Sequence, residues 1–347
     1  MTGQPWWRPD RLAARRERLA VRAAILSVVR AFFAEREFIE VETPALQVSP
    51  GLEPHLQAFA TALHEPGDGT ARPRYLHTSP EFTMKKLLAG GMERIWQLAR
   101  VFRDGERSAT HHPEFAMIEW YRAGASDRDL MADCEALLRC VQHAAGRDRV
   151  SWQGRIADAR LPWERLTVAE AFRRFAGIDL LATLPDATRP DAGRLAAAAR
   201  EAGIDPHPGD DWECLFFRIM LDRIEPQLGH PAPTVLYDYP LPLAALARRK
   251  FEAPHLAERF ELYVCGLELA NGFGELTEAA EQRARFVADQ ARKLALYGVT
   301  YPIDEDFIAA LEHGLPECAG IALGFDRLVM LATDAERIED VLWAPVM

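Results

Sequence analysis

The clearest pattern of hydrophobic and polar positions lies near residue 100, in two short runs that flank a charged turn. The apolar residues of the run 95–102 have the spacing of a strand, and this run ends at Arg103. Residues 104–108 are turn-forming, and a second strand is predicted over residues 115–120, in which Phe115, Met117 and Glu119 alternate with Ala116, Ile118 and Trp120. The pattern predicts a half-buried β-hairpin with a charged tip.

Apolar residues at helical spacing near the N-terminus predict one helix there, with arginines on its other face. The residues at this spacing are Val21, Ile25, Val28 and Phe32. Residues 127–146 predict an amphipathic helix and residues 234–242 a strand, whereas residues 163–233 mix helical patterns with Pro- and Gly-rich breaks. Residues 58–74 predict a loop or a hairpin tip.

Composition narrows the classes of protein to consider. The chain has 347 residues, which is enough to bury a sizeable core. Its formal net charge of −11, from 41 basic and 52 acidic residues, weakens the case for a broad electrostatic footprint on nucleic acid. Five cysteines without a CxxC spacing are typical of reduced thiols in a cytoplasmic protein rather than of zinc ligands or disulfides. No apolar run has the length of a membrane span, and the N-terminal pattern does not favour a signal peptide.

The predicted hairpin carries groups that suit a nucleotide. A guanidinium fixed at the end of a strand, as at Arg103, can donate to two phosphate oxygens at once. Phe115, on the second strand, offers a stacking face to a nucleobase. Taken alone, the segment favours a half-buried hairpin with a charged tip and no ligand, but two later segments of the chain add further candidate groups.

Two carboxylates lie seven residues apart in the segment 261–278. They are Glu268 and Glu275, and the turn signal Asn271-Gly272 stands between them. Two strands, or a strand and a bend, would bring both carboxylates to one site. Such a pair suits a hard cation such as Mg²⁺.

A third segment, residues 320–330, has small residues before an Asp-Arg pair that opens an apolar helix. Gly320, Ala322 and Gly324 allow a ligand to approach the backbone closely. Arg327 then lies near a helix N-terminus, where the helix dipole favours phosphate. The alternative is a structural arginine paired with Asp326.

Together these segments resemble the three motifs of the class II aminoacyl-tRNA synthetases. Residues 38–46 resemble motif 1, Arg103 with Phe115 resembles motif 2, and residues 320–330 resemble motif 3. The segments that further resemble the lysyl-tRNA synthetase subgroup are 79–81, 111–115, 119–121 and 268–273. The resemblance covers nearly the whole chain and implies an α+β fold, with an antiparallel β-sheet flanked by helices. It also implies a single catalytic domain over residues 1–347, with a helical insertion at about residues 160–233.

One part of a lysyl-tRNA synthetase has no counterpart in the sequence. Its anticodon-binding OB-fold barrel needs roughly a hundred residues, whereas motif 1 begins here by Phe38. A catalytic domain without the barrel is similar to the elongation factor P lysine ligase family. That resemblance implies a ligase that activates (R)-β-lysine with ATP, as an adenylate, and transfers it to a lysine ε-amine of elongation factor P. AMP and pyrophosphate would be released.

The resemblance also implies residue roles at the nucleotide. Arg103 would bridge the α-phosphate and the amino-acid carboxylate, and Arg327 would reach the γ-phosphate side and lie over the adenine, opposite Phe115. Glu268 and Glu275 would hold Mg²⁺. Further ATP-binding residues would be Asp104, Gly105, Glu106, His112, Leu269 and Gly324. Two of these depart from the family pattern: Glu106 stands one place later than the usual glutamate, and His112 replaces an asparagine.

The amino-acid pocket needs carboxylates for two amines. The resemblance assigns Glu81 and Glu275 to the substrate amines, and Glu119 with Tyr121 to the side-chain end. A solvent-exposed strand face is an equally good reading of Glu119. Ser79, Pro80 and Ala322 complete the substrate-binding set. Ala322 stands where lysyl-tRNA synthetases have glycine, and its methyl group would crowd α-lysine more than β-lysine.

The expected partners are elongation factor P, a lysine-like amino acid and a second copy of the chain that pairs through residues 38–46. No membrane partner is expected, and the absent barrel with the net acidity disfavours tRNA. Two alternatives stay open: a truncated lysyl-tRNA synthetase that uses α-lysine and tRNA, and a non-enzymatic amino-acid-binding paralogue. The joint presence of Arg103, Arg327, Glu268 and Glu275 argues against the second.

Overall fold

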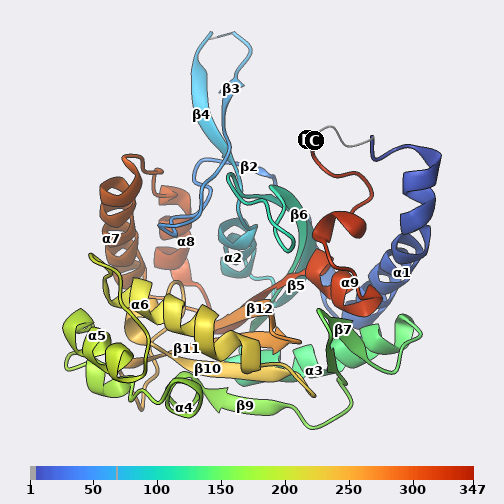
Figure 1. Ribbon diagram of the computed structural model, residues 1–347. Coiled ribbons are helices and arrows are strands. Elements are labelled where there is room, and N and C mark those ends of the chain that lie inside the picture. Colours follow the sequence, from blue (N-terminus) through green and yellow to red (C-terminus); the bar gives the residue numbers. More distant parts are fainter. Residues whose placement is uncertain (1–4, 68) are drawn as a thin grey trace. The chain divides into compact units, whose positions relative to one another are not determined.

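The computed structural model describes residues 5–67 and 69–347, which form two compact units (Figure 1). Unit 1 consists of the chain up to Ala125 together with Thr277–Cys318 and Ala322–Met347. Unit 2 consists of Ser126–Leu276 and Ala319–Ile321. Strand β13 (Cys318–Gly324) is therefore divided between the units.

The predicted hairpin is the central feature of unit 1. Strands β5 (Arg94–Phe102) and β6 (Glu114–Ala123) pair antiparallel from Arg94↔Arg122 to Phe102↔Glu114, which confirms the hairpin. The short strand β1 (Ile39–Glu40) adds to β5 in parallel. Because directly opposed residues of an antiparallel pair lie on the same face, this register decides which side chains can form a site.

Helix α1 (Pro9–Ala34) packs against the hairpin through aromatic residues. Phe33 stacks on Trp96 of β5 at 4.7 Å between ring centroids and contacts Trp120 of β6 at 5.4 Å. The helix is confirmed, but the expectation that its arginines face away is wrong for Arg15 and Arg22, which are buried. Their charges are accommodated because Arg15 donates to two backbone carbonyls and Arg22 to a buried carboxylate.

A second hairpin of unit 1, formed by β3 (Ala60–His64) and β4 (Ala71–Leu76), extends away from the rest of the unit (Figure 1). It joins β2 (Leu46–Gln47) in a three-stranded sheet, in the order β2-β4-β3. The expectation of a hairpin tip in residues 58–74 is thus met, although Asp68 lies outside the described residues.

Four further helices complete the described part of unit 1. Helices α2 and α8 pack through a ring stack between Phe82 and Phe307, with centroids 4.7 Å apart, and α7 lies beside α8. The predicted helix after residue 324 is confirmed as α9, which contacts α1 and β6. The bounds are α2 (Glu81–Ala89), α7 (Ala279–Tyr297), α8 (Glu305–Gly314) and α9 (Phe325–Thr333), with the short 3₁₀ helix η6 (Ile338–Asp340).

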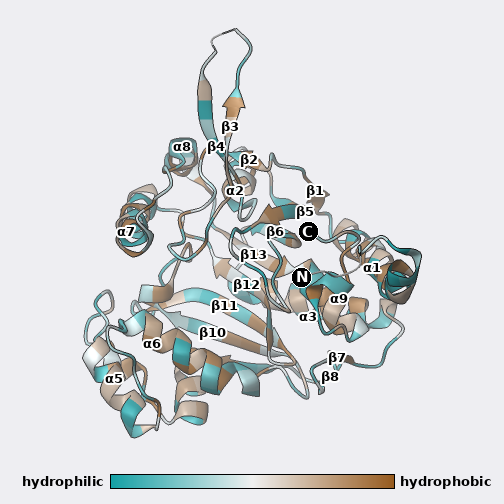
Figure 2. Ribbon diagram, turned by 45° about the horizontal axis from the view of Figure 1, so that its top comes forward, coloured by the Kyte–Doolittle hydropathy of each residue, from teal (hydrophilic) through white to brown (hydrophobic). Residues whose placement is uncertain are grey.

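Unit 2 is built on an antiparallel meander of β10 (Thr234–Pro240), β11 (Leu256–Val264) and β12 (Leu267–Gly274), which lie side by side in Figure 2. Strand β9 (Glu164–Thr167) pairs with β10 in parallel. The strand predicted at 234–242 is confirmed.

The turn expected at Asn271-Gly272 is wrong. Both residues lie inside β12, and the chain reverses instead at Cys265 and Gly266, whose φ angles are 56° and 78°. Two successive positive φ angles match a tight hairpin turn. Gly272 serves packing: it pairs with Phe260 on the neighbouring strand β11, and a Cβ at position 272 would lie 2.5 Å from the Phe260 ring, so glycine leaves room for that ring within the sheet.

Helices cover the meander of unit 2. Phe216 of α6 lies between Phe172 and Trp212, with ring centroids 4.9 and 5.5 Å away, and this cluster packs on Tyr239 of β10. The mainly helical character of residues 160–233 is confirmed, and the amphipathic helix at 127–146 is α3. The remaining bounds are α3 (Asp127–Ala144), β7 (Val150–Trp152), β8 (Arg155–Ala157), α4 (Val168–Ala171), η1 (Phe172–Ala176), η2 (Leu181–Thr183), α5 (Ala192–Glu201), α6 (Trp212–Ile219), η3 (Met220–Ile224), η4 (Glu225–Gln227) and η5 (Leu241–Leu243).

Within residues 5–67 and 69–347, no helix combines the length and the apolar character that crossing a membrane requires. The five cysteines are free thiols in the structure.

Candidate active site

One face of the β5–β6 hairpin gathers the residues expected at the nucleotide and at the amino acid. Phe115, Glu119 and Tyr121 alternate along β6 and therefore lie on one face of the sheet. Arg103 follows the end of β5, and its guanidinium carbon lies 5.2 Å from the centroid of the Phe115 ring. Glu106 approaches the same guanidinium at 3.9 Å. The hairpin thus holds a cation, an aromatic face and a buried carboxylate within one unit.

The loop after Arg103 is fixed by backbone contacts. The Asp104 N–H donates to the carbonyl of Gln57 at 2.8 Å, and the Asp104 carboxylate accepts a hydrogen bond from the N–H of Gly105 at 2.9 Å. Gly105 has a φ of 80°, which a residue with a side chain would adopt only with strain. A pocket of about 540 Å³ borders this loop. Its lining residues are Phe59, Leu76, Phe102, Asp104, Gly105, Glu106, Arg107, Pro113, Glu114 and Val346.

Motif 3 is joined to the hairpin by a buried carboxylate. Gly324 precedes helix α9 as its N-cap residue, and Asp326 in the first turn accepts a 2.7 Å hydrogen bond from the N–H of Ala116. Its other oxygen accepts a hydrogen bond from Arg22. Asp326 is therefore engaged by β6 and α1, which gives this carboxylate a structural role independent of Arg327.

Arg327 points instead to the loop between β5 and β6. Its Nη2 atom lies 2.9 Å from His111 Nε2, and its Nε donates to the carbonyl of Thr110 at 3.4 Å. The pKa of His111 is lowered by burial and by the charges of Arg327 and Arg103, so the imidazole is neutral at pH 7 and can accept from a guanidinium. His111 was not among the expected site residues.

Ser79, Glu119 and Tyr121 form a buried hydrogen-bonded group. Ser79 Oγ donates to Glu119 Oε1 at 2.6 Å, and Tyr121 Oη donates to Glu119 Oε2 at 3.0 Å. Burial, followed by the charge of Glu81, raises the pKa of Glu119 to about 8, so that without a ligand this carboxyl group is largely protonated at pH 7. Glu119 is 1% exposed, so the reading of this residue as part of a solvent-exposed strand face is wrong.

A second carboxylate faces this group from helix α2, whose N-cap residue is Pro80. The Glu81 N–H donates to Ser79 Oγ at 3.0 Å. One Glu81 oxygen pairs at 2.5 Å with Nζ of Lys85, one helical turn later, and Lys85 is fully buried. Glu81 therefore has an internal counter-ion, which a sequence motif alone did not reveal.

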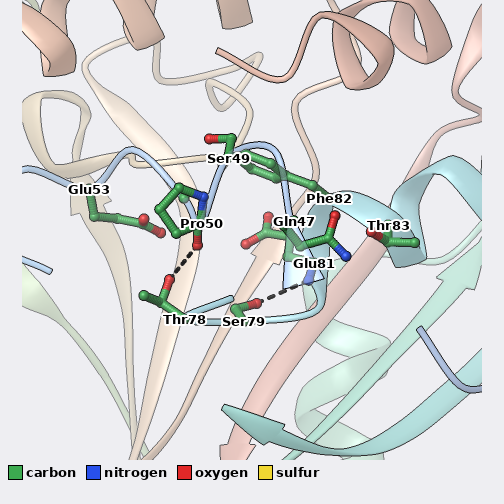
Figure 3. A pocket seen from close by; sticks show the side chains of 10 residues that line it. Gln47, Ser49, Pro50, Glu53, Thr78, Ser79, Glu81, Phe82 and Thr83 are labelled. Carbon is green, nitrogen blue, oxygen red and sulfur yellow. Dashed lines mark hydrogen bonds between the residues drawn. The ribbon is translucent and has the colours of Figure 1, made fainter. Parts of the chain in front are cut away.

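A narrow pocket lies beside Glu81 (Figure 3). Figure 3 shows the carboxyl groups of Glu53 and Glu81 directed into it, from the segment after β2 and from α2. Thr78 Oγ1 closes one side by donating to the carbonyl of Pro50 at 2.7 Å. Gly51, with a φ of 120°, forms part of the wall, because a Cβ there would lie 2.8 Å from a Glu53 carboxylate oxygen. Glu53 was not among the expected residues.

His112 is occupied by the backbone. Its Nε2 accepts from the N–H of Val346 at 3.2 Å, and its Nδ1 lies 2.6 Å from the carbonyl of Glu114, to which it donates as the neutral tautomer. The residue is 1% exposed. These contacts favour a structural role over the expected donation to ATP.

Ala322, on β13, belongs to the same small apolar cluster as Phe115. The buried members of this cluster are Ala99, Val101 and Met117, and Phe115 and Ala322 pack against it with partly exposed side chains. A methyl group at position 322 therefore borders the face of the hairpin that carries Phe115.

The remaining expected residues lie in unit 2. Glu268, opposite Tyr263, and the buried Leu269 are on β12, and Glu275 follows the end of that strand, bridged to Ala247. No group of three or more His, Cys, Asp or Glu side chains among residues 5–67 and 69–347 is arranged as a metal site. Two carboxylates alone suit a cation that a phosphate substrate also ligates, because Mg²⁺ is commonly bound by one or two carboxylates and by substrate phosphates.

Three residues of unit 1 lie at the candidate site although the sequence did not assign them to it: Glu53, Lys85 and His111. Lys85 had a usable signal in the sequence, because Glu81 and Lys85 stand four residues apart on a helix. His111 precedes the expected His112 and lies within the segment 111–115 that resembles the lysyl-tRNA synthetase subgroup. Nothing in the local sequence distinguishes Glu53 from an ordinary loop glutamate.

Comparison with known proteins agrees with this arrangement. A family model described as tRNA synthetases class II (D, K and N) matches residues 8–347, which confirms the fold class. A Vibrio cholerae protein named elongation factor P–(R)-β-lysine ligase is 40% identical over 329 residues, covering 94% of each chain. Proteins of that name from Sodalis glossinidius and Pectobacterium carotovorum are each 39% identical, over 99% and 97% of this chain and 98% and 96% of theirs. The chain therefore belongs to the class II tRNA synthetase family, in the branch of the elongation factor P–(R)-β-lysine ligases.

Proposed function

We propose that this chain is a ligase that activates (R)-β-lysine with ATP and transfers it to a lysine ε-amine of elongation factor P. The observation that carries the proposal is that Arg103, Phe115, Glu119 and Tyr121 share one face of the β5–β6 hairpin. An aminoacyl adenylate of a diamino acid requires a cation for its phosphate, a stacking surface for its adenine and a carboxylate for its side-chain amine. The names of the relatives supply the identity of both substrates.

Activation joins the amino-acid carboxylate to the α-phosphate. A carboxylate oxygen attacks phosphorus, the bond to the bridging oxygen breaks, and pyrophosphate leaves. Negative charge builds on the α-phosphate during this step, so a preorganised cation lowers the barrier. Arg103, whose guanidinium lies beside the Phe115 ring, is the proposed cation for that position. Arg327 and Phe115 are proposed to hold the adenine between a guanidinium and a ring.

Asp104, Gly105 and Glu106 are proposed to border the nucleotide from the loop after Arg103, with Gly324 and Leu269 as further contacts. Glu106 is proposed as an ATP-binding residue because its carboxylate Oε1 lies 3.9 Å from Nη1 of Arg103. Glu268 and Glu275 would hold Mg²⁺, which would neutralise part of the triphosphate charge when bound. Hard oxygen ligands fit that ion.

Glu81 and Glu275 are proposed to face the substrate amine that lies nearer the substrate carboxylate. Glu119 and Tyr121 are proposed to bind the distal amine of the substrate. The raised pKa of Glu119, about 8, supports this role. An arriving ammonium would stabilise the ionised carboxylate, because an opposite charge at hydrogen-bond distance favours the charged form. Ser79, Pro80 and Ala322 are proposed to shape the pocket.

Transfer forms an amide. The neutral ε-amine of the acceptor lysine attacks the adenylate carbonyl, AMP leaves, and the amine loses a proton. A lysine ε-amine is ordinarily protonated at pH 7, so the site must favour its neutral form. The acidic chain, with a net charge of −11, is compatible with attraction of a basic acceptor loop.

The proposal includes a homodimer in the cytoplasm and one catalytic domain. A single family model that spans residues 8–347 supports one domain. The edge strand β1 and the exposed apolar residues Ile39, Leu46 and Val48 support pairing through motif 1. Free cysteines are compatible with a reducing compartment.

The test is ATP–pyrophosphate exchange with α-lysine, (R)-β-lysine and (S)-β-lysine, followed by incubation with elongation factor P. We expect exchange to be fastest with (R)-β-lysine, and elongation factor P to gain the mass of one lysyl group. Charging of tRNA without a mass shift on elongation factor P would overturn the proposal in favour of a truncated lysyl-tRNA synthetase. Binding without exchange would favour the non-enzymatic alternative.

A further inference from the structure

The segment of residues 51–58, here called the pocket segment, is held by a buried lysine from another part of unit 1. Lys293 of α7 is fully buried, and its Nζ donates to the carbonyls of Pro54 at 2.9 Å and Leu56 at 2.5 Å. The same ammonium lies 4.7 Å from the centroid of the Tyr301 ring, whose hydroxyl accepts a hydrogen bond from the N–H of Ala58. A lysine charge buried in this way fixes the backbone of the segment.

The other end of the pocket segment is tied to motif 2. The carbonyl of Gln57 accepts a hydrogen bond from the backbone N–H of Asp104, the residue after Arg103. Position 53 is thus placed by α7 on one side and by the nucleotide loop on the other. A side chain on this segment has a defined location relative to Arg103, which is not typical of an exposed loop.

Charges in the pocket are unevenly compensated. Glu81 has Lys85 as a counter-ion, and the buried Glu119 is held largely protonated. In the described part of the chain Glu53 makes no ion pair, and burial, followed by the charge of Glu81, raises its pKa against the smaller opposing effects of Arg103 and Lys293. Among the described residues Glu53 is therefore the pocket carboxyl group that lacks an ion-pair partner, and an arriving ammonium would favour its ionised form.

The size of the pocket limits what can enter. The space between its lining residues, which include Glu53, Glu81 and Ser79, is about 10 Å³. That is close to the volume that one water-sized group occupies, so the pocket admits a single ammonium head and excludes a whole amino acid.

We infer that Glu53 recognises the ammonium group that lies nearer the carboxylate of the amino-acid substrate, with Glu81 on the opposite wall of the same pocket. The inference rests on the proposed function. It assigns this end of the substrate to Glu53 because the pocket segment is hydrogen-bonded through Gln57 to Asp104, the residue after Arg103, which is the proposed partner of the substrate carboxylate. Glu119 and Tyr121 serve the distal amine in the proposed function. Glu53 is thereby a specificity residue for the position of that amine.

The test compares wild type with Glu53→Gln in ATP–pyrophosphate exchange, using Glu65→Gln on the exposed hairpin as the matched control. We expect Glu53→Gln to raise KM for (R)-β-lysine by at least about tenfold, as for loss of one charge-assisted hydrogen bond, and to leave KM for ATP within about twofold. Glu53→Asp, which keeps the charge, should recover part of the loss.

Two inhibitors locate the contact. 3-Aminohexanoic acid keeps the amine near the carboxylate, and 6-aminohexanoic acid lacks it. Glu53→Gln should weaken inhibition by the first about as much as it raises KM for the substrate, and should leave inhibition by the second unchanged. If Glu53→Gln weakens both inhibitors equally, or weakens neither while the wild type is active, the inferred role of Glu53 is wrong and the proposed function still stands. A folded wild type without exchange on any lysine isomer would overturn the proposed function as well.

Discussion

Asp326, in the first turn of α9, accepts a 2.7 Å hydrogen bond from the backbone N–H of Ala116 on β6. The neighbours of this pair along the chain are Arg327 and Phe115, the two residues proposed to hold the adenine. One buried carboxylate thus sets the spacing between the helix that carries the guanidinium and the strand that carries the ring. Its second oxygen is taken by Arg22 of α1, so three elements of unit 1 meet at a single side chain.

Asp326→Asn should damage both stability and nucleotide binding. An amide offers one oxygen in place of two, so either Arg22 or the Ala116 N–H loses its acceptor. Breaking a buried ion pair from one side costs about 3–5 kcal/mol. Urea unfolding should report a loss of this size, and KM for ATP should rise. The exposed Asp306 is the control position, and Asp306→Asn should behave as wild type. Unchanged unfolding of Asp326→Asn would contradict the linking role.

Arg327→Ala should abolish most of the adenylation without unfolding the protein. The side chain is partly exposed and contacts His111 and the carbonyl of Thr110, which are loop groups rather than core. Loss of a preorganised cation at a phosphate costs about 10²–10³-fold in rate. Exchange measured alongside Arg337→Ala, an exposed arginine on the same unit, separates this role from general charge loss. A folded Arg327→Ala with wild-type exchange would refute the assignment.

The parts of the fold that depend on local pattern were predictable from the sequence. Alternation fixed the β5–β6 hairpin, and small residues before an Asp-Arg pair indicated α9. Contacts between distant residues were not. Arg22 was assigned to a polar helix face because its partner Asp326 stands 304 positions away. A buried arginine looks like an exposed one until its acceptor is known.

Local sequence also could not predict that Asn271-Gly272 lies within a strand or that Glu53 lines a pocket. Asn271-Gly272 has turn chemistry, but the ring of Phe260 requires a glycine within the strand, so packing prevailed over local propensity. Glu53 became a candidate because Lys293, 240 positions away, anchors the backbone around it. Motif resemblance predicted which residues would touch the substrates, and it gave no information on which contacts hold those residues in place.

Glu119→Gln should change how stability depends on pH. The folded-state pKa of about 8 lies above the ordinary value of 4.5, so between these pH values the folded protein holds a proton that the unfolded chain has released. The free energy of unfolding of wild type therefore falls as pH rises through this window. Glutamine does not titrate, and it should remove a dependence on the order of a few kcal/mol.

This effect is measured by urea unfolding at about pH 5 and pH 8.5 without substrate. Glu119→Gln should be similar to wild type at the lower pH and more stable at the higher pH, while the exposed Glu93→Gln should follow wild type at both. Parallel pH profiles for wild type and Glu119→Gln would show that the carboxyl group titrates normally.

Ile39→Glu should weaken the proposed homodimer. Ile39 is 56% exposed on the edge strand β1, where a charge would be buried against a second copy. Sedimentation at micromolar concentration should give a dimer for wild type and a lower mass for the variant. Ile156→Glu, at a residue that is 48% exposed in unit 2, controls for the loss of an exposed isoleucine. A wild type that sediments as a monomer would contradict the proposed homodimer.

Ala322→Gly should reduce the preference for (R)-β-lysine over α-lysine. The Ala322 methyl group packs beside Phe115 and the buried Met117, on the side of the hairpin face proposed to hold the adenylate. Removing it would free space next to the α-carbon of the substrate, where α-lysine carries its amine. A methyl-sized change in a pocket is worth about 1–3 kcal/mol, or roughly 10- to 200-fold in kcat/KM.

The measurement is the ratio of kcat/KM for the two isomers in pyrophosphate exchange. The ratio should shift toward α-lysine mainly through a gain for α-lysine, because (R)-β-lysine places its amine away from the methyl group. Ala319→Gly, at a buried alanine on the same strand, tests whether any cavity in β13 has this effect and should leave the ratio unchanged. An unaltered ratio in Ala322→Gly would move the determinant of selectivity elsewhere, with the amine pocket at Glu53 as the next position to vary.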